Sequence, residues 1–316
     1  MPSYRLAGKR IWVAGSSGMV GRAISRQLEN ENCELISVGR ERLDLRRQSD
    51  VEDWMAETRP QAIFLAAAKV GGIMANQTFP ADFLYDNLMI ESNIIHAAHR
   101  IGVEKLMFLG SSCIYPRNAA QPITEDALLT GALEPSNEWY AIAKIAGIKL
   151  CQAYRRQFGS DFVSAMPTNL YGEHDNFDLQ TSHVIPALIA KTHAAKTKGA
   201  AALDVWGTGT PRRDFLYVDD AAAAIVYLMQ HYSDEQHLNV GAGRDISIGE
   251  LSALICEVVG FQGGLNFLTD KPDGTPLKKL DTSRLSALGW QARIGLREGI
   301  TRTYDWYCEQ LANPNR

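Results

Sequence analysis

Short apolar runs alternate with helical patterns through residues 11–166, and this alternation constrains the fold more than any other feature. The strand-like runs cover residues 11–14, 34–38, 62–67, 105–109 and 162–166. Helical patterns fall between them at residues 20–28, 46–58, 81–101 and 140–158. The runs are almost continuously apolar, as in strands that are covered on both faces. The pattern predicts right-handed βαβ units and therefore an α/β fold built on a parallel sheet.

The pattern loosens after residue 172, which indicates a second structural unit. Residues 172–182 are polar and loop-like, 184–198 are helical, and 204–206 form a short strand-like run. Strand-like runs at 215–218 and 238–240 flank a helical stretch at 221–229. We therefore expect a doubly wound, Rossmann-type domain at 1–172, to which about 214–243 returns. A smaller α/β domain, mainly for binding substrate, is expected at 173–316.

A glycine-rich turn joins the first strand-like run to the first helical pattern. It reads Gly15-Ser16-Ser17-Gly18-Met19-Val20-Gly21. Glycines allow a tight turn and close backbone approach to a pyrophosphate, and the helix N-terminus offers free N–H groups. The spacing is G-x-x-G-x-x-G rather than the G-x-G-x-x-G fingerprint. Because the strand–turn–helix context is right, we expect these seven residues to bind a dinucleotide.

Arg40 follows the second strand-like run, where an acid would bind the adenosine 2′-hydroxyl of NAD. An arginine at this place suits the 2′-phosphate of NADP instead. Arg40 therefore indicates NADP(H) as the cofactor, and an ordinary exposed arginine is the alternative interpretation.

A hydroxyl, a phenol and an ammonium form the candidate reducing centre. Ser111 ends the fourth strand-like run, and Tyr140 and Lys144 share one face of a helical stretch because they are four residues apart. A nearby ammonium is expected to lower the pKa of a phenol from its ordinary value of about 10. Tyr140 can then donate a proton to a carbonyl oxygen that Ser111 also hydrogen-bonds. Cys113 has no part in such a reduction, and a small buried residue is the usual role of a lone cysteine.

Several long segments resemble the extended short-chain dehydrogenase/reductase family, which acts mainly on nucleotide sugars. The segments are residues 66–72, 109–116, 134–138, 140–149, 166–172, 182–188 and 271–276. The resemblance covers nearly the whole chain. Within the family, the chain is similar to members that epimerise and then reduce a GDP-linked 4-keto sugar with NADPH. Ser17 departs from some members of this group, which carry an arginine there, so Arg40 is left to support the 2′-phosphate.

The resemblance implies a second role for Cys113. A ketone at C4 of a sugar acidifies the hydrogens at C3 and C5, and inverting those carbons requires a base and an acid on opposite faces. Cys113 and His183 are the implied pair, with Cys113 as the base. Both side chains exchange protons near neutral pH after modest tuning of their pKa values. The resemblance also places these residues against the cofactor: Leu109, Gly110, Lys144, Pro167, Asn169, Leu170 and His183.

Cationic and aromatic residues of the C-terminal half are the candidates for binding the nucleotide sugar. Arg213 offers a planar, bidentate fork to a diphosphate, and Lys278 can add charge near it. The resemblance implies substrate contacts at Asn169, Lys191, Trp206, Arg213 and Asp273. An ordinary solvated helix lysine is the alternative interpretation of Lys191.

Other functions remain open from the residues alone. A UDP-sugar 4-epimerase or a 4,6-dehydratase can be built on the same scaffold. A 4-epimerase needs no external thiol base, and a dehydratase requires an acid near Cys113, where Ser112 and Ile114 stand. A non-catalytic NADP-binding regulatory protein is expected to have lost Tyr140 or Lys144, and both are present.

The composition and charge of the chain limit which partners and which cellular location we expect. The net charge of −4 gives no electrostatic reason to expect nucleic acid. No apolar segment is long enough for a membrane span, and residues 1–10 contain no apolar signal core. Five widely spaced cysteines without a Cys-x-x-Cys pair indicate reduced thiols, a cytoplasmic location and no metal site. The helix at 81–101 has more than one apolar stripe, which fits either a homodimer or burial within one chain.

Overall fold

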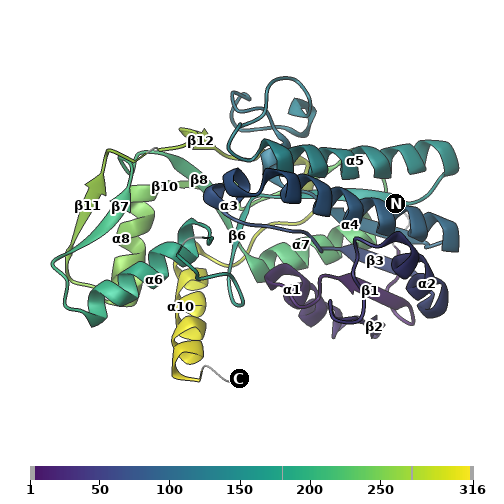
Figure 1. Cartoon of the computed structure of the whole chain (residues 1–316), viewed down its shortest axis with the longest axis horizontal. Helices are drawn as coiled ribbons and strands as arrows, with labels where there is room; N and C mark the ends of the chain where they lie inside the picture. The colour runs from purple at the N-terminus through teal and green to yellow at the C-terminus, as the bar shows by residue number, and fades with distance from the viewer. Residues whose placement is uncertain (1–3, 180, 272, 314–316) are drawn as a thin grey trace.

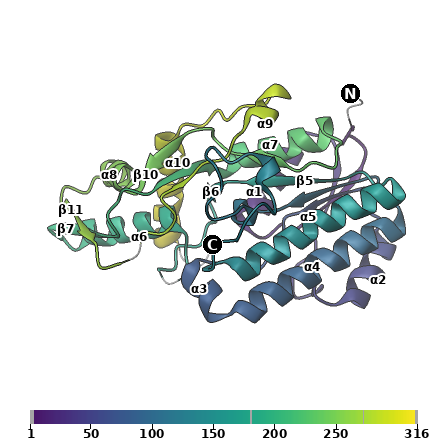
Figure 2. The ribbon, with the colours of Figure 1, turned by 90° about the horizontal axis from the view of Figure 1, so that it is seen from above.

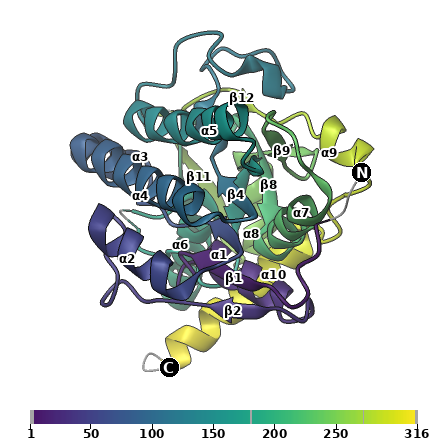
Figure 3. The same cartoon turned by 90° about the vertical axis from the view of Figure 1, so that its right-hand side faces the viewer.

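The computed structural model describes residues 4–179, 181–271 and 273–313 and is built around a six-stranded parallel sheet. The strand order is β2-β1-β3-β4-β5-β9 (Figures 1 and 3). The bounds are β1 (Arg10–Ala14), β2 (Glu34–Ile36), β3 (Ala62–Leu65), β4 (Lys105–Leu109), β5 (Phe162–Pro167) and β9 (Leu238–Val240). The predicted Rossmann-type α/β class is therefore confirmed.

Helices cover both faces of this sheet, because alternate residues of each strand point to opposite sides. Val13 and Phe64 pack with α1 (Met19–Leu28) and α7 (Val218–His231) on one side. Trp12 and Ile63 pack with α2 (Gln48–Thr58), α4 (Pro80–Ile101) and α5 (Glu138–Phe158) on the other. Because both faces are buried, the central strands β1, β3, β4 and β5 are mostly apolar.

The second part of the molecule contains two smaller sheets, at the left of Figure 1. β8 (Arg212–Tyr217) pairs with β10 (Asp245–Ser247), β12 (Leu277–Lys278) and β6 (Asn169–Tyr171), and β7 (Ala202–Trp206) pairs with β11 (Gly264–Leu268). α6 (Val184–Thr197), α8 (Ile248–Val259) and α10 (Leu296–Ala312) pack around a separate apolar cluster. The shorter elements are α3 (Ile73–Thr78), η1 (Ser112–Ile114), η2 (Glu125–Ala127) and α9 (Ser283–Ala287).

Part of the stretch at 214–243 pairs with the large sheet, and one strand of it does not. β9 pairs with β5, and α7 packs beside α1. β8 instead belongs to the small sheet, where its parallel partners are β6 and β12. The pattern of a strand does not reveal its partner, so the sequence could not separate β8 from β9 in this stretch. The division into two domains stays a prediction.

Within the described residues, no helix is both long and apolar enough to cross a lipid bilayer. Residues 1–3 of the expected signal-free N-terminus and Pro272 of the 271–276 segment lie outside the described residues.

Candidate active site

The candidate site lies where parallel strands end. β2 lies on one side of β1 and β3 lies on the other. After β1 the chain therefore moves one way along the sheet to form β2, and then crosses back past β1 to form β3. Such a switch in strand order opens a crevice at the carboxyl ends of the strands. Gly15, Ala66, Ser111 and Thr168 each follow a strand of this sheet at that edge. Residues far apart in the sequence therefore meet there.

The glycine-rich turn has the shape that a bound dinucleotide requires. Gly15 has φ +90°, and a Cβ at this position would lie 2.7 Å from the backbone nitrogen of Ala67. A Cβ on Gly21 would lie 2.0 Å from the Gly15 carbonyl oxygen, whereas one on Gly18 would meet only ordinary contacts. α1 begins at Met19 without a side-chain cap and without an acid in its first turn. The free N–H groups suit a pyrophosphate, and so does the positive end of the helix dipole, which no acid in the first turn neutralises.

Cys113 lies directly beside the serine of the reducing centre. Ser111 is the N-cap of η1, and its Oγ accepts a hydrogen bond from the Cys113 backbone nitrogen at 3.5 Å. Cys113 is buried, and burial raises the pKa of its thiol, against the opposing effects of Lys278, Ser111 and Lys144. The two lysines lower the pKa because their positive charges stabilise a thiolate.

The expected lowering of the pKa of Tyr140 is not found. Burial places this pKa well above the ordinary value, Cys113 and Glu91 raise it further, and a hydrogen bond with Ser111 lowers it. The nitrogen of Lys144 lies 5.9 Å from the centroid of the Tyr140 ring and is not among the groups that shift this pKa. The main physical reason is burial, because taking the phenol out of water disfavours its charged form.

Lys144 is held inside the protein, with 2% of its surface exposed. Its Nζ lies 3.8 Å from Glu91 Oε2 and 4.7 Å from the centroid of the Phe108 ring. Burial lowers the pKa of Lys144, and Glu91 raises it. Lys144, Tyr140, Ser111 and Cys113 thus form one cluster at the ends of β4 and α5.

His183 occupies the N-cap position of α6, and its side chain is exposed. The preceding residues contact the start of α3, where the Gly72 nitrogen donates a hydrogen bond to the Thr181 carbonyl oxygen at 3.0 Å. Desolvation by the surrounding protein lowers the pKa of His183. A helix N-terminus also disfavours an imidazolium, so His183 is more readily neutral than a free histidine.

Two cations stand side by side in the small sheet. Lys278 of β12 is in register with Arg213 of β8. The pKa of Lys278 is lowered by burial and by Arg213, and burial lowers the pKa of Arg213. Two adjacent, partly desolvated cations repel one another unless an anion lies between them, and a diphosphate is such an anion.

The other predicted substrate residues lie in the second part of the molecule. Lys191 Nζ lies 5.0 Å from the centroid of the Trp206 ring, which is 54% exposed. Asp273 accepts hydrogen bonds from the Thr208 backbone nitrogen at 2.6 Å and its Oγ1 at 2.8 Å, so Asp273 also holds the turn after β7. The Asn169 amide donates to the Asp214 carbonyl oxygen at 2.9 Å.

Comparison with known proteins identifies the family. A family model described as the NAD dependent epimerase/dehydratase family matches residues 11–241. The chain belongs to this family. A GDP-L-fucose synthase of Sinorhizobium fredii (strain NBRC 101917 / NGR234) is 58% identical over 99% of this chain and 100% of the relative. The GDP-L-fucose synthase of Escherichia coli (strain K12) is 53% identical over 96% and 98% of the two chains.

A solved structure agrees with this assignment to the epimerase/dehydratase family. A GDP-L-fucose synthetase from Naegleria fowleri, bound to NADP, is 29% identical and superposes with a TM-score of 0.91. The match covers 99% of this chain and 98% of that chain. The predicted resemblance to the extended short-chain dehydrogenase/reductase family is therefore confirmed.

The remaining predicted cofactor residues of this epimerase/dehydratase chain fall at the same strand ends. Arg40 follows β2, is exposed, and makes no hydrogen bond or ion pair with any residue that the structure describes. Ser17 is exposed, and its carbonyl oxygen accepts a hydrogen bond from Arg22 Nε at 2.9 Å. The Leu109 side chain is buried in the core, so only its backbone can reach a ligand. The others are Gly110 after β4, Pro167 at the end of β5, and Leu170 in β6.

Sequence reasoning missed a buried polar network behind Cys113. Tyr115 Oη donates a hydrogen bond to Asn239 Oδ1 at 2.5 Å and lies 2.9 Å from His237 Nε2. The Asn239 backbone nitrogen donates to the buried carboxylate of Glu125 at 3.0 Å. This network ties the segment after Cys113 to β9 and η2. No local sequence pattern predicts this network, because its members lie far apart in the sequence.

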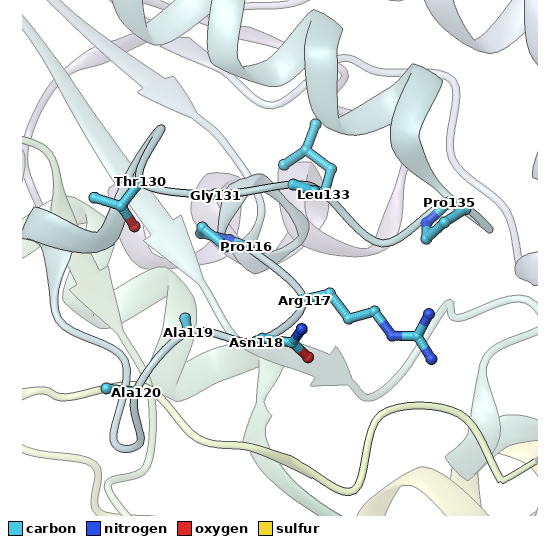
Figure 4. Close-up of a pocket in the computed structure, with 10 residues that line it drawn as sticks. Pro116, Arg117, Asn118, Ala119, Ala120, Thr130, Gly131, Leu133 and Pro135 are labelled. Carbon is cyan, nitrogen blue, oxygen red and sulfur yellow. The ribbon is translucent and has the colours of Figure 1, made fainter.

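The structure has a cavity of about 450 Å³ beyond this network, between two loops at residues 116–120 and 130–135 (Figure 4). Arg117 from the first loop pairs with Glu134 of the second at 3.3 Å. None of the four residues of the candidate cluster lines this cavity. Among the described residues, no group of three or more potential ligands can hold a metal ion.

Gly21→Ala is expected to abolish tight NADPH binding and to destabilise the fold. The added methyl would meet the Gly15 carbonyl oxygen at 2.0 Å, so either the turn or α1 must move. Thermal unfolding and titration with NADPH measure the two effects. Gly18→Ala is the matched control for folding, since its methyl has room within the chain. Wild-type stability and NADPH affinity in Gly21→Ala would contradict the proposed role of the turn.

Proposed function

We propose that this chain converts GDP-4-keto-6-deoxy-D-mannose to GDP-L-fucose, by epimerisation at C3 and C5 followed by NADPH-dependent reduction of the C4 ketone. The observation that carries the proposal is the position of Cys113, which is buried beside Ser111 and close enough to Tyr140 and Lys144 to alter their ionisation. A simple carbonyl reductase does not need this thiol. Relatives that are 53–58% identical over nearly the full chain are named GDP-L-fucose synthase.

Epimerisation is assigned to Cys113 and His183. The C4 ketone stabilises the carbanion that forms when Cys113 removes a proton from C3 or C5. His183 then returns a proton to the opposite face of the same carbon. The raised pKa of Cys113 makes its thiolate a strong base once formed, and the lysine charges nearby favour its formation. The lowered pKa of His183 makes its protonated form a ready proton donor.

Reduction is assigned to Tyr140, Ser111 and Lys144. NADPH, when bound, supplies the hydride that reaches C4. Tyr140 gives its phenolic proton to the C4 oxygen, and Ser111 orients that oxygen by a hydrogen bond. The high pKa of Tyr140 keeps the phenol protonated at neutral pH, which suits a proton donor. The ammonium of Lys144 stabilises the phenolate that remains.

Binding of the nucleotide sugar is assigned to the second part of the molecule. Arg213 and Lys278 provide the adjacent cations that a diphosphate requires. The exposed ring of Trp206, with Lys191 above it, offers a flat apolar surface to a sugar or base. Asn169 is placed at the boundary between the two parts, where it can orient the sugar, and Asp273 holds the turn next to Trp206.

NADP(H) is assigned to the glycine-rich turn, Arg40, Lys144, His183 and the strand-end residues described above. Arg40→Ala is expected to weaken NADPH binding about tenfold or more and to leave NADH binding unchanged, because one charged contact to the 2′-phosphate is lost. Affinities for both cofactors measure this effect. Arg42→Ala is the control, since Arg42 is a second exposed arginine of the same loop. Equal losses for NADPH and NADH would contradict the assignment.

The proposed reaction is tested with purified protein, NADPH and GDP-4-keto-6-deoxy-D-mannose. NADPH oxidation that depends on this sugar, with GDP-L-fucose as product, is the expected result. UDP-galactose tests the UDP-sugar alternative, and turnover of that sugar without net NADPH oxidation would select a 4-epimerase. Cofactor binding without turnover of either sugar would select a non-catalytic role.

We also propose a homodimer that pairs α4 and α5 of two copies. Tyr85 of α4 is 60% exposed, and Trp139 and Phe158 of α5 are 41% and 52% exposed. The two helices lie side by side on one face, as Figure 2 shows. Sedimentation equilibrium tests the proposal, and a monomer mass at micromolar concentration would overturn it. A cytoplasmic location is proposed from the five cysteines, all of which are free thiols.

A further inference from the structure

Glu91 is a buried acid with an unusual environment. It lies on α4, where 1% of its surface is exposed, and neither carboxylate oxygen makes a hydrogen bond of ordinary geometry with a described residue. The backbone of Gly147 is near enough to lower its pKa. Its neighbours in the helix include Ile94 and Ile95, which are fully buried. A buried carboxylate without partners is costly, so its presence requires a compensating interaction.

The nearby cation is Lys144 of α5. Its Nζ lies 3.8 Å from Glu91 Oε2, and both side chains are shielded from water. α4 and α5 lie side by side (Figure 2), and the ion pair joins one helix to the other. At this distance in a shielded setting, the two charges interact far more strongly than on a surface.

The packing of α5 holds the lysine in this position. A Cβ at Gly147 would lie 2.4 Å from the Phe108 ring, so glycine lets α5 lie directly on β4. Lys144, one turn earlier, then places its Nζ 4.7 Å from the centroid of the same ring. The ring face attracts the ammonium from one side and Glu91 attracts it from another.

We propose that Glu91 is a positioning residue that keeps the Lys144 ammonium charged and held against Phe108, so that Lys144 can serve Tyr140. Burial alone would drive Lys144 toward its neutral form, and Glu91 opposes this. Glu91 itself has a pKa raised to about 7 by burial, with Lys144 acting against that rise. The other titratable groups that face the pair are Tyr140 and Cys151 of α5 and Cys113 of η1. Burial raises the pKa of each of these three groups and keeps it uncharged near pH 7, so none of them supplies a negative charge that could replace that of Glu91.

The first test needs no substrate and therefore does not depend on the proposed function. The protein is labelled with ¹³C at the lysine ε-carbon, and the Lys144 signal is assigned by its loss in Lys144→Met. In Glu91→Gln, the pKa of Lys144 is expected to be lower than in the wild type by about one to three units. Glu91→Asp keeps the charge and should recover part of this shift. An equal pKa of Lys144 in Glu91→Gln and the wild type overturns the proposal.

The second test rests on the proposed function and separates reduction from epimerisation. Lys144 must be protonated for reduction, so activity is lost as pH rises through its pKa. In Glu91→Gln this basic limb is expected to move to lower pH, with NADPH oxidation at pH 8 reduced about tenfold or more. Deuterium uptake from D₂O at C3 and C5 should fall much less, because Cys113 and His183 perform that step. An unmoved basic limb in Glu91→Gln overturns the proposal.

The control distinguishes positioning from general damage. Asp220→Asn changes another buried carboxylate, which accepts hydrogen bonds from the Arg293 and Ile294 backbone nitrogens at 2.8 and 2.7 Å. It is expected to lower thermal stability without moving the basic limb or the Lys144 signal. If Asp220→Asn moves both as Glu91→Gln does, the effect is structural and the proposal fails. A wild type that never turns over the GDP-sugar rejects the proposed function alone, since the ¹³C titration still decides the role of Glu91.

Discussion

Tyr140→Phe is expected to reduce the rate of C4 reduction by about 10²- to 10⁴-fold, the usual contribution of a positioned general acid. The substitution removes only the phenolic oxygen, so the packing of the ring against Phe83, with centroids 6.4 Å apart, should remain. The C4 oxygen then has no proton donor, and Ser111 can only hydrogen-bond it. Single-turnover oxidation of NADPH with GDP-4-keto-6-deoxy-D-mannose measures the loss.

Epimerisation should survive in Tyr140→Phe, which makes the variant informative. Solvent deuterium should still enter C3 and C5, because Cys113 and His183 are unchanged. Tyr154→Phe is the matched control on the same helix, since its hydroxyl contacts His96 Nδ1 at 2.5 Å rather than the site. A Tyr140→Phe variant that reduces the ketone at the wild-type rate would show that another group donates the proton.

Cys113→Ser is expected to suppress deuterium uptake at C3 and C5 by about 10²-fold or more, because a serine hydroxyl is a far weaker acid and forms little alkoxide. NADPH affinity should remain, since the substitution changes one atom of a side chain outside the glycine-rich turn. Because burial raises the pKa of Cys113, the wild-type exchange rate should increase as pH rises above neutrality. This rise should be absent in Cys113→Ser.

A second buried thiol provides the control for this prediction. Cys256 lies on α8 in the second part of the molecule, and Cys256→Ser should exchange deuterium at the wild-type rate. Normal exchange in Cys113→Ser would exclude the thiol as the base. The same experiment on His183→Asn tests the acid, whose loss should block inversion of the carbon.

Elements of the large sheet were predictable because their local pattern is strong. β1, β3, β4 and β5 lie within two residues of the predicted runs, as do α4 and α5. β6, β10 and β12 were missed, since each has only two or three residues and is defined by its partners. Such short strands carry too little periodicity to be distinguished from loops.

The candidate site also contains residues that a local pattern indicates and residues that it does not. Ser111, Tyr140 and Lys144 were found because each has a motif with a short, regular spacing. Glu91 has none: it is one of three acids on its own helix, and its partner is on another helix. The expected lowering of the pKa of Tyr140 was not found because burial, which local spacing does not reveal, raises it, and Cys113 and Glu91 raise it further.

By itself the sequence determined the parallel α/β architecture and the glycine-rich turn, and it supplied the candidates for the reactive side chains. These depend on local periodicity and on residue chemistry, which the order of residues records directly. Only the tertiary structure decided that β8 leaves the large sheet, that Arg213 lies beside Lys278, and that Glu91 faces Lys144. Each of these depends on burial and on contacts between distant segments, and both arise only when the chain has folded.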